Sequence, residues 1–216
     1  MHFHCERDTP SALRWRDGSP GHQVSNILLD ENDVVKIANF RLAKNLSSGS
    51  PVRSATPYPQ STPGYMDLSY FYDNDLTRAI DVYSFRAACL DILCRKPVVV
   101  EVSENGGQKS QQNLAQLVGD KAKKGSLLVM IDPEIKNKIS RKFITKFYDI
   151  AESCFRRPKQ PEIGKRPQTS DVLTQLLTLR SHFESQLELH KTSHAEISGI
   201  SLSLLMNCLL IRHHSC

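Results

Sequence analysis

Residues 77–94 read TRAIDVYSFRAACLDILC, and this stretch decides the fold class. Apolar side chains recur at helical spacing along one side of it, at Val82, Phe85, Cys89, Ile92 and Leu93. The opposite side is also apolar and carries Ala79, Ala87, Ala88 and Leu90. A helix that is apolar nearly all round is buried. We therefore predict a central helix over this stretch, which Pro97 prevents from continuing.

The sequence on either side of this helix predicts more helix and little sheet. Two β-rich runs at 27–29 and 34–37 flank an acidic turn at 30–33, which predicts a small hairpin. Residues 45–63 are rich in Ser, Thr and Pro, and residues 98–110 contain a Gly-Gly tip, so both predict loops.

Three further helices are expected towards the C-terminus. A short helix around Leu114, Leu117 and Val118 ends by Gly125. A second helix is capped by Ser140 and has a stripe of Phe143, Phe147, Ile150, Ala151 and Cys154. The last starts near residues 169–170 and turns Val172, Leu173, Leu176, Phe183 and Leu187 inward. These elements together predict a mainly α domain.

Composition and charge exclude several other classes of protein. The chain has 39% hydrophobic and 24% charged residues, as ordinary globular domains do. Its net charge is +5, and the basic residues are scattered; we interpret the longest cluster, at 121–124, as a solvated helix end. Six cysteines without a Cys-x-x-Cys pair are interpreted as reduced, small apolar residues of a cytosolic protein. We expect no nucleic-acid partner.

No targeting or membrane-spanning segment is expected. Met1 is not followed by the basic and apolar regions of a signal peptide. The apolar run at 197–211 is shorter than the ~20 residues that cross a bilayer. We therefore predict a short apolar helix or a disordered tail there.

Two stretches carry a family resemblance. The first, SNILLDEN at 25–32 and VKIANFRLAK at 35–44, is similar to the segment of protein kinases written HRDxKxxN … DFG. The second, TPGYMDLSY at 62–70 and then LT and DVYSF within 76–85, is similar to the plant receptor-like kinase pattern GTxGYxDPEY … LTxKSDVYSFG. The match continues in order at Ile131-Asp132-Pro133, Cys154, Arg166-Pro167 and Asp171-Val172-Leu173. Residues 12–187 thus resemble plant receptor-like Ser/Thr protein kinases, most of all their malectin-type subgroup.

The resemblance implies a mainly α kinase C-lobe with a short β-hairpin, at residues 24–189. Residues 1–23 are expected to be irregular and to hold a remnant of the first C-lobe helix, and 190–216 to be a non-family tail. The first residues show no glycine-rich loop and no phosphate-anchoring Lys, so we expect the N-lobe to be absent. The first C-lobe helix is also expected to be deleted, which should uncover apolar surface on the helices that contain Phe85 and Phe147.

The family reaction is the transfer of a phosphoryl group from Mg²⁺-bound ATP to protein Ser or Thr, but its catalytic residues have been replaced. The His, Arg, Asp and Lys of the catalytic loop correspond to Ser19, Pro20, Gly21 and Gln23. The metal-binding Asp corresponds to Asn39, and Arg41 replaces the Gly of that motif. Neutral amides are weaker Mg²⁺ ligands than carboxylates. We therefore expect no catalytic residue, only vestigial cofactor positions at Asn26 and Asn39, and no bound cofactor or metal.

Other family positions are structural. The resemblance places Ser61, Thr62, Gly64 and Tyr65 in the activation segment, whose Ser and Thr residues other kinases could phosphorylate. It gives structural roles to Asp81 and Arg166. Ser69 stands where the family has the Glu that pairs with that arginine, so we expect Arg166 to lack this partner. Arg86 replaces a Gly of the central helix and should reach out to solvent or displace its neighbours.

Three functions stay open. The first is an inactive, kinase-like binding module whose partner is a full-length receptor kinase or another protein. The second is a degenerate gene copy without a selected function, and the third is residual Ser/Thr kinase activity. The expected location is cytoplasmic, or the inner face of the plasma membrane through a partner.

Overall fold

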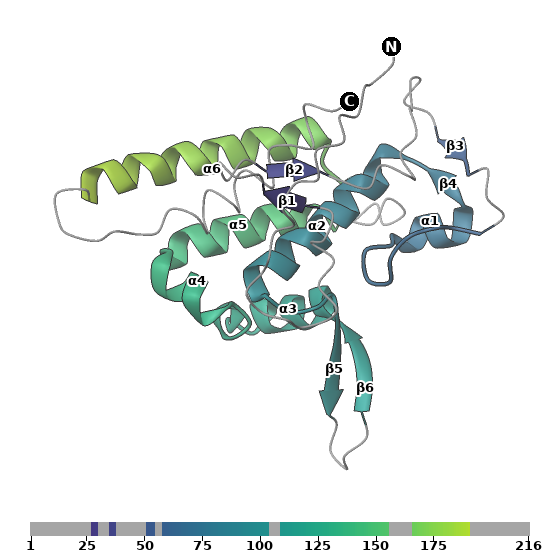
Figure 1. Ribbon diagram of the computed structural model, residues 1–216, viewed down its shortest axis with the longest axis horizontal. Helices are drawn as coiled ribbons and strands as arrows, with labels where there is room; N and C mark the ends of the chain where they lie inside the picture. The colour runs from purple at the N-terminus through teal and green to yellow at the C-terminus, as the bar shows by residue number, and fades with distance from the viewer. Residues whose placement is uncertain are drawn as a thin grey trace.

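The computed structural model describes residues 27–29, 35–37, 51–54, 58–103, 109–155 and 166–190 (Figure 1). The helices are α1 (Leu68–Asp73), α2 (Arg78–Cys94), α3 (Leu114–Lys123), α4 (Pro133–Lys138), α5 (Arg141–Ser153) and α6 (Thr169–His190), with a 3-10 turn η3 (Leu127–Val129). The strands are β1 (Ile27–Leu29), β2 (Val35–Ile37), β3 (Val52–Arg53), β4 (Asp75–Leu76), β5 (Val99–Ser103) and β6 (Lys109–Asn113). The predicted mainly α fold is confirmed.

Helix α2 is central, as its sequence predicted. It packs against α3 and α5, and residues from both of its sides are buried, among them Val82, Ala87, Cys89 and Leu90. The helix ends at Cys94, and Arg95 then adopts a left-handed conformation (φ 47°). Together with α3, α5 and α6, α2 buries one continuous apolar core.

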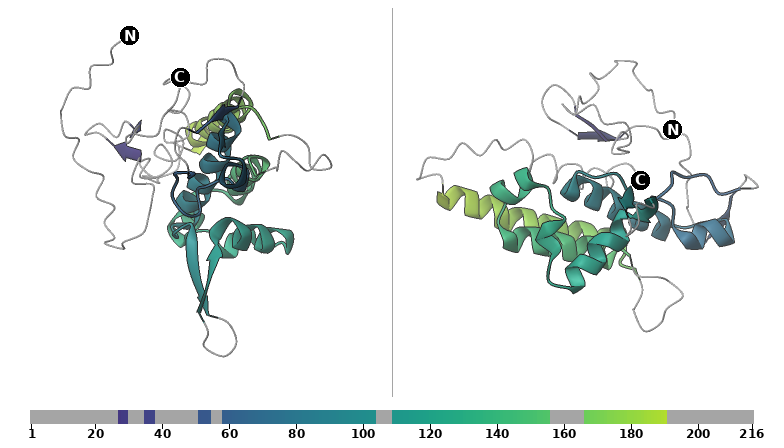
Figure 2. Two further views of the ribbon diagram at one scale, coloured as in Figure 1. Left: turned by 90° about the vertical axis from the view of Figure 1, so that its right-hand side faces the viewer. Right: turned by 90° about the horizontal axis from the view of Figure 1, so that it is seen from below.

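Helices α5 and α6 lie side by side (Figures 1 and 2) and close this core. Ser140 caps α5 by accepting a hydrogen bond from the backbone N–H of Phe143, as predicted. The rings of Phe143 and Phe183 meet edge to face at 5.1 Å between the two helices. On α6 the buried residues are Val172, Leu176 and Leu179, whereas Leu173 is only half-buried.

The three sheets among the described residues are each two-stranded and antiparallel. The predicted hairpin is present as β1–β2, with Ile27 opposite Ile37. The loop predicted over 98–110 is wrong in large part, because β5 and β6 form a ribbon that projects from the helices (Figure 2). The β-branched residues of β5 favour a strand, but the polar sequence of β6, KSQQN, gives no strand signal of its own.

Two short elements are set by local capping. Helix α3 ends before Gly125, which has a positive φ of 69°, as predicted. Helix α4 was not predicted, although Asp132 followed by Pro133 is a helix-start signal. The Asp132 carboxylate accepts hydrogen bonds from the backbone N–H groups of Glu134 and Ile135.

Phe147 itself is 1% exposed, and the uncovered apolar surface expected on its helix and on that of Phe85 stays a prediction. Phe147 lies in the core between the helices, and Phe85 packs half-buried against the same core. Residues 1–26 and 191–216 lie outside the described part of the chain, so the proposed domain boundaries stay predictions. Within the described residues, no helix is both long and apolar enough to cross a membrane.

Candidate functional site

The structure brings one group of predicted site residues together and leaves the other undescribed. Asn26, Asn39 and the catalytic-loop positions 19–23 lie outside the described residues. The described ones are Ser61, Thr62, Gly64, Tyr65, Asp81 and Arg166. Tyr65 and Arg166 make contacts that attach residues 58–76 to α2, and Gly64 forms the turn before Tyr65. We call residues 58–76 the anchored segment.

The anchored segment begins with a tight turn against the start of β5. The backbone N–H of Tyr65 donates to the carbonyl of Thr62 at 3.0 Å. Gly64 has φ +87°, and a Cβ added there would lie 2.8 Å from the Val98 Cγ1 atom. Only glycine combines this backbone conformation with this close approach. Ser61 is exposed and Thr62 is half-buried beside the turn.

Tyr65 is held by α2 at both its ring and its backbone. Its hydroxyl donates to the Asp91 carboxylate at 2.7 Å, and the Ser84 hydroxyl donates to its carbonyl oxygen at 3.0 Å. Asp91 is 2% exposed. Burial, reinforced by this carboxylate, raises the pKa of the Tyr65 phenol well above its usual range, so the phenol stays a donor. The sequence reading missed Asp91, because an Asp on an apolar helix does not by itself indicate its partner.

Arg166 lacks the family Glu, as expected, but the expected uncompensated charge is wrong, because Asp67 is a buried carboxylate partner. Its guanidinium lies 2.6 Å from Asp67 Oδ2 and also donates to the carbonyl oxygen of Ala79. The Asp67 Oδ1 atom accepts from the backbone N–H of Ser69 and so caps α1. Asp67 therefore pairs with Arg166 through one carboxylate oxygen and caps α1 through the other. It lies two residues before Ser69, which replaces the family Glu.

Arg86 does not reach solvent, which corrects one of the two alternatives expected for it. It is 3% exposed, and its guanidinium donates to Glu152 Oε2 at 2.8 Å and to the Ala115 carbonyl at 3.4 Å. The ring of Phe155 lies under the guanidinium, 3.9 Å from its centre. Within the described residues its Nε–H group has no hydrogen-bond partner. The Glu152 carboxylate, which comes from α5 and stays partly exposed to water, neutralises the charge of Arg86.

The two buried arginines are joined by aromatic rings. Arg86 stacks on Phe155, Phe155 lies 6.1 Å from Tyr83, and Arg166 lies 5.5 Å from the Tyr83 ring centre. Cations are attracted to ring faces, so each arginine gains a second stabilising contact. Cys154 is fully buried near both arginines, and burial raises the pKa of its thiol to about 11. A protonated, buried thiol is a structural and not a reactive group.

The remaining predicted residue, Asp81, is exposed in the first turn of α2. A carboxylate is favourable there because the helix N-terminus carries partial positive charge. The catalytic-loop backbone that the family Asp holds lies outside the described residues, so this role stays a prediction.

The described part of the chain has an exposed apolar surface beside the anchored turn. No three His, Cys, Asp or Glu side chains within it gather as a metal ion would require. Beside the anchored turn, α1 instead exposes Leu68, Phe71 and Tyr72, and the rings of the last two meet edge to face at 5.3 Å. We call these three residues the α1 face.

Comparison with known proteins identifies relatives but no matching family model. The receptor-like protein kinase ANXUR1 of Arabidopsis thaliana is 35% identical over 158 residues, which are 71% of this chain and 17% of ANXUR1. The receptor-like protein kinase THESEUS 1 of the same plant is 34% identical over 174 residues, or 80% of this chain and 18% of THESEUS 1. The probable LRR receptor-like serine/threonine-protein kinase MEE39 is 30% identical over 152 residues, 70% of this chain and 16% of MEE39.

The chain spans less than a fifth of the length of these curated relatives. LRR kinases match it nearly as well as the others, so the malectin-type subgroup stays a prediction. By sequence over about seven tenths of its length, this chain belongs to the family of the plant receptor-like protein kinases and corresponds to a small part of such a protein.

Proposed function

We propose that this chain is a kinase-like binding module that does not transfer phosphate. Support comes first from the sequence, in which the positions of the catalytic Asp and the metal-binding Asp hold Gly21 and Asn39. Phosphoryl transfer depends on positioning and charge neutralisation, and these replacements remove a base and a metal ligand. The family's Mg²⁺ and ATP would be held at Asn26 and Asn39, and the described residues offer no alternative metal cluster.

The observation that carries the proposal is the compensation of both buried arginines. Arg166 keeps a carboxylate after the family Glu is lost, and Arg86, new at its position, meets Glu152. A buried charge that loses its partner costs about 3–5 kcal/mol. A degenerate copy free of selection would accumulate such losses. The retained pairs therefore favour a chain that must fold, even where its chemistry has been replaced.

The α1 face is the surface through which we propose that the module binds. Leu68, Phe71 and Tyr72 are each more than half exposed at the end of the anchored segment. Contiguous exposed apolar residues commonly mark protein interaction sites. The proposed partner is the kinase domain of an intact receptor-like kinase, which would bring the chain to the cytoplasmic face of the plasma membrane.

Two measurements on the purified chain test the catalytic half of this proposal. We expect no transfer of the ATP γ-phosphate to protein and a cooperative thermal transition whose midpoint is unchanged by Mg²⁺-ATP. A ligand that binds only the native state would raise that midpoint. Phosphate transfer that Asn39→Ala abolishes would contradict the proposal, and a non-cooperative melt would favour a degenerate copy.

A pull-down with a receptor-like kinase domain tests the binding half. Replacing Phe71 and Tyr72 by Ser should abolish binding, because the apolar contact area is removed. The matched control is Val129→Ser, which removes an apolar side chain that is 68% exposed on η3. Equal binding by all variants would show that the α1 face is not the interface.

A further inference from the structure

A second surface of the molecule concentrates positive charge. Residues 135–148, IKNKISRKFITKFY, contain five Lys or Arg and no Asp or Glu. The net charge of this stretch, +5, equals that of the whole chain. The stretch spans the end of α4 and the first two turns of α5. Five of the 28 basic residues therefore lie close together in the sequence, on two adjoining helices.

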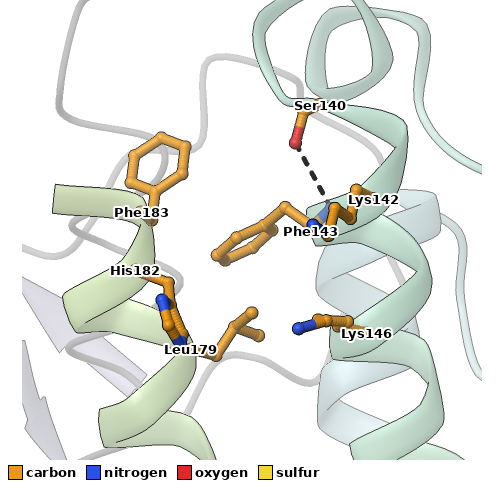
Figure 3. Close-up of a pocket in the computed structure, with 7 residues that line it drawn as sticks. All are labelled: Ser140, Lys142, Phe143, Lys146, Leu179, His182 and Phe183. Atoms are coloured by element: carbon orange, nitrogen blue, oxygen red, sulfur yellow. Dashed lines mark hydrogen bonds between the residues drawn. The ribbon is translucent and has the colours of Figure 1, made fainter. Parts of the chain in front are cut away.

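This basic stretch borders a pocket between α5 and α6 (Figure 3). The pocket has a volume of about 110 Å³ and is lined by Ser140, Lys142, Phe143, Lys146, Leu179, His182 and Phe183. The rings of Phe143 and Phe183 approach from opposite helices, and Lys146 reaches from α5 towards Leu179 and His182 of α6. Its walls are therefore apolar, and its rim holds two lysines and a histidine.

No carboxylate lines this pocket to neutralise its rim. Within the described residues, Lys142 and Lys146 form no ion pair, and both are exposed. The nearest acidic residue of α6 with a described side chain, Glu184, is engaged by Arg180 at 2.6 Å. An anionic group entering the pocket would thus meet two ammonium groups that no described carboxylate neutralises.

We propose that this pocket binds an acidic peptide segment of a partner protein, with one apolar side chain of the peptide seated against Phe143, Leu179 and Phe183. The charge of the rim selects carboxylates on the peptide, and the pocket volume suits a single side chain. Phe143 and Leu179 are each only 5% exposed, so the apolar walls are recessed. A recessed pocket receives a protruding side chain, whereas a membrane surface requires apolar side chains that protrude from the protein.

This inference rests on the proposed binding role and adds a partner class to it, at a surface separate from the α1 face. Its probe is a fluorescein-labelled peptide of Asp and Glu with one central Phe, followed by fluorescence anisotropy. Saturable binding that weakens as salt is added is expected. The same peptide with Lys in place of its acidic residues, and the acidic peptide with Ser in place of Phe, should bind much more weakly.

Charge reversal on the protein locates the site. Lys142→Glu with Lys146→Glu should weaken peptide binding about tenfold or more. The matched control is Lys121→Glu with Lys123→Glu, which makes the same change of charge at exposed positions of α3 and should leave binding unchanged. All four lysines are exposed, so both double variants should fold, and a thermal melt of each checks this.

Three outcomes would overturn the inference. The first is absence of binding by the acidic Phe peptide, and the second is equal weakening by the two double variants. The third is binding of anionic phospholipid vesicles or duplex DNA, lost on Lys142→Glu with Lys146→Glu, without peptide binding.

A chain that binds the peptide at this pocket but no kinase domain would contradict only the proposed α1 partner. A chain that binds the kinase domain and not the peptide would contradict only the pocket.

Discussion

The surroundings of the two buried arginines differ, although each arginine has a carboxylate and an aromatic ring. Arg166 and Asp67 have side chains that are 3% and 7% exposed, and Arg166 also donates to a backbone carbonyl. Arg86 is as deeply buried, but its partner Glu152 is 38% exposed. The first pair is isolated from water and the second is open on its acidic side. Burial of a guanidinium is thus tolerated in two ways, by a dry pair or by a carboxylate that reaches in from solvent.

The dry pair should respond most strongly to the loss of one partner. Asp67→Ala leaves Arg166 buried without a carboxylate and removes the cap of α1, so we expect a loss of about 3–5 kcal/mol in the free energy of unfolding. Urea unfolding measures it. The control Asp75→Ala removes an exposed carboxylate that lies 3.8 Å from Arg53 and should cost little. Equal effects of both changes would contradict the distinction between the pairs.

The open pair should respond less. Glu152→Gln removes the charge next to Arg86 but leaves an amide acceptor and access to water, so we expect a loss of about 1–2 kcal/mol. The matched control is Glu134→Gln, at an exposed pair with Arg95. Thermal unfolding of both variants provides the measurement. A loss as large as that of Asp67→Ala would show that Arg86 depends on its carboxylate as strongly as Arg166 does.

Replacement of the arginines themselves should sharpen the comparison. Arg86→Met replaces a guanidinium that has an unsatisfied Nε–H by an apolar side chain beside Phe155, so its effect should be within about 1 kcal/mol. Arg166→Met leaves the carboxylate of Asp67 buried and should destabilise the chain by more. Chemical unfolding of the two variants gives the difference directly. The reverse order would refute the distinction between a dry and an open pair.

A smaller loss of stability is expected at the hydrogen bond between Tyr65 and Asp91. Tyr65→Phe removes the hydroxyl that donates to Asp91, and the buried carboxylate then has one partner fewer. We expect a loss of about 1 kcal/mol. Tyr72→Phe, which removes an exposed hydroxyl, serves as the control and should leave the midpoint of thermal unfolding unchanged.

The last effect disappears at neutral pH and concerns Cys154, which is buried near both arginines. Burial raises the pKa of the Cys154 thiol from 9.0 to about 11. Below pH 9 the thiol is protonated in both the folded and the unfolded chain, whereas above it the unfolded chain loses the proton first. Stability should therefore fall as the pH rises from about 9 to 11, and fall less steeply in Cys154→Ala. Urea midpoints across this range test it, and equal slopes for both proteins would contradict it.

The elements that the sequence predicted well are those with a local cause. The spacing of apolar residues along α2 and the Ser140 cap of α5 act over a few neighbouring residues, and both were predicted correctly. The β5–β6 ribbon was missed because β6 is a strand only through its pairing with β5. Among the site residues, Gly64, Tyr65 and Arg166 were predicted. Their carboxylate partners were not, namely Asp91 for Tyr65 and Asp67 for Arg166. Glu152 was likewise not recognised as the partner of Arg86.

The sequence by itself determined the family and the central helix, because motifs and periodicity are properties of residue order; that the catalytic positions are replaced stays a prediction from the same motifs. Only the tertiary structure decided how the buried charges are neutralised. Arg86 and Glu152 are 66 residues apart in the chain, and Arg166 and Asp67 are 99 apart. No local pattern links such distant residues, since their pairing depends on which helix surfaces meet when the core packs. The same packing of α5 against α6 placed Lys142, Lys146 and His182 around one apolar pocket.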